Sequence, residues 1–121
     1  MPANTSYISI SNSSGNVAAA TATATLTAPA GSLAYISGFV VTGSGATAAS
    51  VINVTVTGVN GGTMTYNIAV PAGVTATTPG LNINFSTPVA ASSYGTNIVV
   101  SVPSFGAGNT NASVVAYGYL V

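Results

Sequence analysis

The sequence contains no lysine, arginine, aspartate, glutamate, histidine, cysteine or tryptophan among its 121 residues. Acid–base catalysis near neutral pH depends on His, Asp, Glu, Lys or Cys. The only titratable side chains present are six tyrosines, which ionise far above that range. A serine or threonine nucleophile would have no neighbouring base to activate it. We therefore expect no catalytic residues and no enzymatic activity.

The same absences exclude two further kinds of site. Zinc sites need Cys or His, and tight calcium or magnesium sites need carboxylates, so we expect neither a metal site nor a cofactor. Nucleic acids are bound mainly by cationic side chains that contact phosphates. Because the chain has no such side chain, we expect no nucleic-acid partner.

The first ten residues, MPANTSYISI, contain neither the basic segment nor the apolar segment of a secretory signal peptide. The chain also lacks the run of about 18 apolar residues that a transmembrane helix requires. We therefore expect no signal peptide, no membrane partner, and synthesis in the cytoplasm of a cell.

The sequence does contain regular alternation of apolar and polar residues. Residues 52–57, 64–70 and 81–85 alternate at every second position, which predicts strands with one buried face. Asn60-Gly61-Gly62, between the first two of these runs, predicts a tight hairpin whose two central positions have positive φ. Further strands are expected at residues 7–11, 17–27, 33–42, 96–102 and 113–121, which makes about eight in total.

The composition favours strands over helices throughout the chain. The helix formers Glu, Lys, Arg and Gln are absent and β-branched residues abound. Short strands separated by turns predict an all-β fold, an antiparallel β-sandwich that is jelly-roll-like with about eight strands. We expect residues 17–121 to form a single domain, and residues 1–16 to be either an N-terminal arm or a first strand. The prolines at 29, 71, 79, 88 and 103 are expected between strands.

The stretch from about Leu26 to Val121 resembles known proteins in its turn and strand patterns. It contains APAGSLAYISGFVVTGSGATAASVINVTVTG, then GTMTYNIAVPAGV, and finally VVSVPSFGAGNTNASVVAYGYLV. These segments resemble small Ala/Gly/Thr/Val-rich proteins encoded among the structural genes of tailed bacteriophages. Small all-β proteins of such phages commonly serve as head decoration or cement proteins, which sit on the capsid lattice, often as trimers.

The resemblance implies a structural virion protein that stabilises the head through protein–protein contacts. Its partners would be other copies of itself, in a homo-oligomer such as a trimer, and a major capsid protein or another virion protein. The motifs are not catalytic signatures, so no functional residue is carried over. The complete lack of charge departs from the many decoration proteins that dock on a charged lattice.

A chain without net charge cannot repel its own copies, which favours a subunit of an assembly. The β-prone segment around Ile8 and Ile10 is a candidate for pairing with the sheet edge of a neighbouring copy. Tyr117 and Tyr119, close together near the C-terminus, are further candidates for assembly contacts.

Other functions are also consistent with the sequence. A glycan-binding module or host-attachment protein would use Asn, Ser and Thr to bind sugars and tyrosines to stack on them. An extracellular filament would use the same uncharged strands. An ice-binding surface is suggested by Thr21, Thr23 and Thr25 and by Thr55 and Thr57, although a flat array needs many such rows in register.

Overall fold

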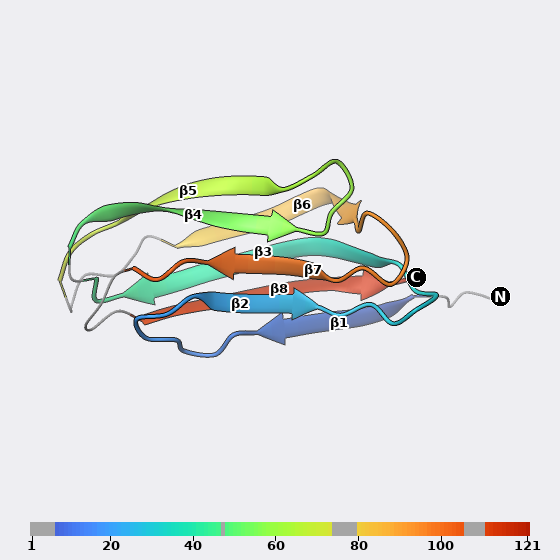
Figure 1. The fold of residues 1–121 in the computed structure, drawn as a ribbon, viewed down its shortest axis with the longest axis horizontal. Helices are drawn as coiled ribbons and strands as arrows, with labels where there is room; N and C mark the ends of the chain where they lie inside the picture. The colour runs from blue at the N-terminus through green and yellow to red at the C-terminus, as the bar shows by residue number, and fades with distance from the viewer. Residues whose placement is uncertain (1–6, 47, 74–79, 106–110) are drawn as a thin grey trace.

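Eight β-strands make up the regular structure of the part of the chain that the computed structural model describes (Figure 1). The described residues are 7–46, 48–73, 80–105 and 111–121, and they contain no helix. The strands are β1 (Ile8–Ser13), β2 (Ala22–Leu26), β3 (Ala34–Ser44), β4 (Ser50–Thr57), β5 (Met64–Val70), β6 (Leu81–Ala90), β7 (Ile98–Val102) and β8 (Asn111–Leu120).

The strands form two four-stranded sheets in which all neighbours are antiparallel. One sheet, called sheet A below, has the order β1-β8-β3-β6; the other, sheet B, has the order β2-β7-β4-β5. Only the connection from β4 to β5 joins neighbouring strands of one sheet. The other connections between consecutive strands cross from one sheet to the other. The predicted all-β class is therefore confirmed at the level of two antiparallel sheets.

The core lies between the apolar faces of the two sheets. Ile36, Phe39 and Val41 of β3 and Val54 and Val56 of β4 are completely buried, and the residues between them in each strand are mostly more exposed. The buried cluster draws side chains from both sheets. Burying an aliphatic or aromatic side chain of this size contributes about 1.5–3 kcal/mol. Because the chain has no charged residue, this core forms without a buried ion pair.

The strand expected at residues 17–27 is shorter than predicted, because β2 begins only at Ala22. Val17 forms an isolated bridge with Ala112 of β8, and Ala19 has a φ of 56°. This left-handed conformation interrupts the extended backbone where the chain passes from β1 in sheet A to β2 in sheet B. The alternation of polar and apolar residues in this segment therefore covers both the connection around Ala19 and strand β2.

The expectation that Pro88 lies between strands is wrong, because this residue lies inside β6. β6 is an edge strand of sheet A, and Pro88 falls in the break of the β3–β6 register between Asn84 and Val89, where it has no paired residue in β3. Pro29, Pro71 and Pro103 do lie between strands, and Pro79 is outside the described residues.

The predicted hairpin joins β4 to β5, but its turn differs from the expected one. The Gly62 N–H donates a 3.3 Å hydrogen bond to the carbonyl of Val59, so that Asn60 and Gly61 are the central residues of the turn. Gly61 and Gly62 have φ angles of 94° and 104°, whereas Asn60 is not in the positive-φ region. The Asn60 N–H donates to the carbonyl of Ala90 at 2.8 Å, which ties the loop to the end of β6.

This turn is expected to deamidate slowly at Asn60. Asn60 and Gly61 are exposed, and no atom lies within 4 Å of the position that a Gly61 side chain would occupy. The Gly61 nitrogen can therefore attack the Asn60 side-chain carbonyl without hindrance and expel ammonia. Water then opens the resulting succinimide ring, which creates the first negative side chain of the protein. Isoelectric focusing after long incubation at mildly alkaline pH should show a growing acidic band. Gly61→Ala should slow its growth, and a single unchanged band from the parent protein would contradict the expectation.

Candidate functional site

The outer face of sheet A, which points away from the core, carries a group of tyrosines and serines. In the β1–β8 register, Ser9 lies opposite Tyr119 and Ser11 lies opposite Tyr117. In the β3–β8 register, Tyr35 also lies opposite Tyr119. Directly opposed residues of an antiparallel pair project to the same side of the sheet. Three strands therefore bring these five side chains to one surface.

A β-bulge in β3 shapes this surface. Ile36 is paired with Gly118, and Gly38 with the preceding residue, Tyr117, so that Ser37 is the extra residue. The Tyr117 side chain lies over Gly38: a Cβ atom added to Gly38 would be only 2.5 Å from the Tyr117 hydroxyl oxygen and 2.8 Å from its Cζ atom. The absence of a side chain at Gly38 thus allows Tyr117 to lie along the sheet.

Tyr119 is held between two other aromatic rings. Tyr35 stacks on it with a centroid distance of 4.9 Å and an interplanar angle of 11°. Tyr7 contacts it in an edge-on arrangement at 5.1 Å and 75°. Tyr117, in contrast, makes no ring contact and no side-chain hydrogen bond with any other residue in the described ranges. The Tyr119 ring is therefore fixed by its aromatic neighbours, whereas the Tyr117 ring is available to contact a ligand.

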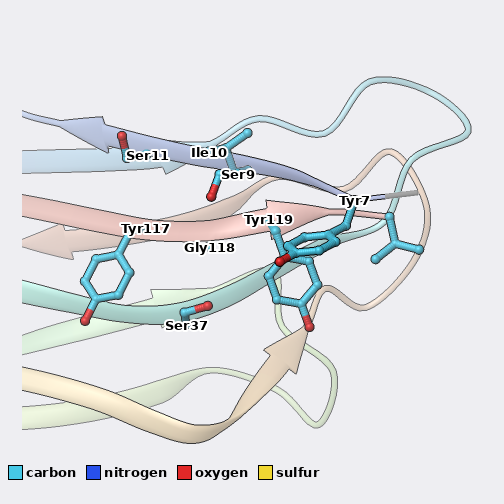
Figure 2. Close-up of a pocket in the computed structure, with 9 residues that line it drawn as sticks. Tyr7, Ser9, Ile10, Ser11, Ser37, Tyr117, Gly118 and Tyr119 are labelled. Atoms are coloured by element: carbon cyan, nitrogen blue, oxygen red, sulfur yellow. The ribbon is translucent and has the colours of Figure 1, made fainter. Parts of the chain in front are cut away.

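A groove of about 750 Å³ lies among these residues. Figure 2 shows Tyr117 on one side of Ser37 and the pair of Tyr7 and Tyr119 on the other side. The volume falls within the range of about 300–1,000 Å³ that is usual for small-molecule sites. The lining residues are Tyr7, Ser9, Ile10, Ser11, Ser37, Tyr117, Gly118, Tyr119 and Val121.

The groove offers hydroxyl groups and aromatic rings but no charge. Ser9, Ser11 and Ser37 make no hydrogen bond through their side chains within the described part of the chain. A hydroxyl group donates one hydrogen bond and accepts up to two. The site can therefore form several hydrogen bonds with a ligand and can contact its apolar surface, but none of its side chains can form an ion pair.

Three of the four residues predicted as assembly contacts meet in this groove. Ile10, Tyr117 and Tyr119 line it, whereas Ile8 does not. Ile8 and Ile10 are each one position away from Ser9, so both side chains project to the other face of β1; Ile10 packs against the core there and lies beside the groove. Ile8 is 65% exposed.

Sequence analysis did not identify Tyr7, Tyr35 or the three serines as part of this site. The alternation of Tyr7, Ser9 and Ser11 at every second position was a usable signal, since it places them on one face of a strand. The sequence around Ser9 does not indicate that this face lies beside Tyr117 and Tyr119, because these two residues are more than one hundred positions later in the chain.

A row of hydroxyl groups crosses the outer face of sheet B. Thr23 of β2 is paired with Ser101 of β7, which is paired with Thr55 of β4, and Thr55 is paired in turn with Thr65 of β5. In the next row, Val99 occupies the position between two threonines. The described residues therefore form one complete hydroxyl row across the sheet, which is short of the many rows that a flat ice-binding array requires.

No helix in the described ranges is long and apolar enough to cross a membrane. Comparisons with protein-family models, with curated proteins and with solved structures found no match to the chain. Its function must therefore be inferred from its own residues and their arrangement.

Proposed function

We propose that the protein is a structural virion protein, a capsid decoration or cement protein that stabilises a phage head through uncharged protein–protein contacts. The observation that carries this proposal is the complete absence of charge from a fold with two open sheets. The edge strands β1 and β6 of sheet A and β5 of sheet B have N–H and C=O groups available for pairing with another chain, whereas on the β2 edge the Thr25 N–H donates to the Asn12 side chain.

Soluble β proteins usually protect such edges with lysine or other charged side chains. This chain has none at any edge, and its neutral surface provides no electrostatic repulsion between copies. These properties suit a subunit that is permanently packed against others. The resulting contacts would depend little on ionic strength, because screening acts on charges.

We further propose that the fold is a jelly roll. The pairing pattern supports this topology: β1 pairs with β8, β2 with β7, β3 with β6 and β4 with β5. Such a pattern arises when one long antiparallel hairpin is rolled up into two sheets. Jelly rolls of eight strands are found in viral capsid proteins and in lectin domains. Together with the resemblance of residues 26–121 to structural proteins of tailed phages, this pattern supports a virion as the assembly.

Edge strand β1 is the best candidate for the contact between copies. It is six residues long and contains neither proline nor charge. Ile8, at its start, is 65% exposed and the preceding Tyr7 is 64% exposed, so this end of the strand presents two large apolar side chains to a partner. A neighbouring strand that pairs with β1 would bury Ile8 and satisfy the free backbone groups of this edge.

A single lysine at Ile8 is expected to weaken self-association of the full-length protein by about tenfold or more, since about 1.4 kcal/mol corresponds to a factor of ten. The added charge would have to be desolvated at the interface, where the chain offers no carboxylate side chain as a partner. Sedimentation velocity over a concentration series measures the change.

Val51→Lys is the matched control for Ile8→Lys. Val51 is 68% exposed, nearly the same as Ile8, but it lies in β4, an internal strand of sheet B. Both variants carry the same net charge, so only the position differs. Equal weakening by both variants would attribute the effect to general repulsion, and a parent protein that stays monomeric at high concentration would contradict the assembly role.

Imaging of the assembled material tests the kind of assembly. Purified parent protein added to phage heads that lack it should occupy regular sites on the icosahedral shell in electron micrographs. Long unbranched polymers of the protein alone would instead favour a filament subunit, the alternative that the sequence leaves open.

A further inference from the structure

We propose that the groove on the outer face of sheet A binds a neutral saccharide. This function is separate from the proposed assembly role, because the groove lies on the outer face of the sheet whereas the assembly contact lies along the β1 edge. The groove combines aromatic walls, free hydroxyl groups and the absence of charge, and each of these features restricts the class of ligand.

The aromatic walls favour a ligand that has a flat apolar side. Tyr117 and Tyr119 are two residues apart on β8, which corresponds to about 6.8 Å along an antiparallel strand. Both side chains project to the outer face of sheet A, so one ligand can contact both of them. The C–H face of a pyranose ring provides such an apolar surface.

The serine hydroxyls favour a ligand that is polar around its rim. Ser9 and Ser11 lie on the β1 side of the groove and Ser37 lies on the β3 side. None of the three forms a side-chain hydrogen bond to another described residue. Hydroxyl groups at the edge of a sugar ring are both donors and acceptors, and they match the serine hydroxyls in number and type.

The absence of cationic side chains argues against anionic ligands of this size. An anionic sugar or a phosphate would lose hydration in the groove without gaining an ion pair to a side chain, which is unfavourable. A purely apolar ligand would leave the three serine hydroxyls without partners. A neutral saccharide is the class that satisfies both restrictions.

The site is also organised before a ligand arrives. Tyr119 is fixed by its contacts with Tyr7 and Tyr35, and Tyr117 rests on Gly38 at the bulge. Tyrosine has few rotatable bonds, so little conformational entropy is lost when such a ring contacts a ligand. The Tyr117 ring contacts no aromatic ring in the described ranges, so it is the ring on which the sugar would stack.

Titration of the full-length protein with neutral hexasaccharides tests the proposal. Maltohexaose, cellohexaose, mannohexaose and chitohexaose are the probes, and hexagalacturonate is the charged control of similar size. Because the chain has no tryptophan and three of its six tyrosines line the groove, binding should change the tyrosine fluorescence, and saturation-transfer NMR identifies the bound sugar. We expect at least one neutral hexasaccharide to bind and hexagalacturonate not to bind.

Variants then localise the binding. Tyr117→Ala is expected to weaken it by about tenfold or more, while Tyr94→Ala, which removes a 65% exposed tyrosine outside the groove, should leave it unchanged. Ser11→Phe fills the groove from the exposed edge strand and should abolish binding even if Tyr117→Ala fails to fold.

Three outcomes would overturn the proposal. One is that none of the four neutral hexasaccharides binds at millimolar concentration. Another is equal binding of hexagalacturonate, which would show that charge does not discriminate. The third is that Ser11→Phe changes the sedimentation of the protein but not saccharide binding, which would identify the groove as a contact between copies.

Discussion

Replacement of Phe39 by alanine is expected to lower the free energy of unfolding by about 3–5 kcal/mol, as is typical of buried aromatic residues. Phe39 is the largest of the completely buried side chains. Its ring, which projects from sheet A, contacts Tyr66 of β5 in sheet B at a centroid distance of 5.4 Å, and it lies 6.4 Å from Phe85 of β6. The side chain thus connects the two sheets on the side where β5 and β6 are the edges.

The surrounding residues cannot close the cavity that Phe39→Ala leaves. The backbone around it is held by two sheets, since β3 is paired on both sides with β6 and β8. The lost apolar contacts and the unfilled volume therefore both reduce stability. Thermal unfolding followed by circular dichroism should show a decrease in Tm of about 10–20 °C for a chain of this length.

Tyr94→Ala serves as the control for Phe39→Ala. Tyr94 is 65% exposed, so its removal should change the free energy of unfolding by less than about 0.5 kcal/mol. Similar Tm values for the two variants would mean that Phe39 does not have the packing role assigned to it. Urea unfolding of the same proteins gives an independent value of the difference.

Much of the fold could be predicted because burial on one face leaves a pattern of period two in the sequence. β5 was predicted from Met64 to Val70 with its observed bounds, since its apolar residues alternate without interruption. The strand at residues 17–27 was predicted too long, because alternation continues through Ala19 although its φ of 56° ends the extended backbone. Local composition reports which face is buried, but it does not report where a chain turns a corner.

The candidate site could be predicted only in part, for a related reason. Tyr117 and Tyr119 were selected for their spacing, and this spacing does place both on the outer face of sheet A. The bulge at Ser37 and the pairing of Ser9 with Tyr119 depend on strand register. Register is determined by the whole sheet and not by any short segment, so the groove became visible only when the strands were assembled.

The lack of charge has different consequences for the two proposed surfaces. At the β1 edge it removes the repulsion that would keep copies apart. In the groove it removes every ion pair to a side chain, so selectivity depends mainly on shape and hydroxyl groups. The Ile8 and Tyr117 variants therefore test separate properties, and either proposal can fail while the other stands.

Gly118→Ala is expected to destabilise the protein by about 3 kcal/mol, at the upper end of the usual effect of overpacking, because the clash involves backbone atoms. Gly118 lies in β8 opposite Ile10 and Ile36, at the centre of sheet A. A Cβ atom at this position would overlap the carbonyl oxygen of Tyr35 and lie 2.9 Å from its carbonyl carbon. The main chain of β3 cannot move aside as a flexible side chain would.

Gly61→Ala separates this steric effect from the general cost of replacing glycine. Gly61 has a φ of 94° and nothing within 4 Å of its missing side chain, so alanine there costs about 1–2 kcal/mol of backbone strain without a clash. Gly118→Ala should therefore unfold at a lower temperature than Gly61→Ala. It should also lose saccharide binding, because separating β3 from β8 at this point displaces Ser37 from Tyr117. A Gly118→Ala protein that is as stable as Gly61→Ala would show that β3 and β8 are not in contact as described, and the groove built on that contact would have to be abandoned.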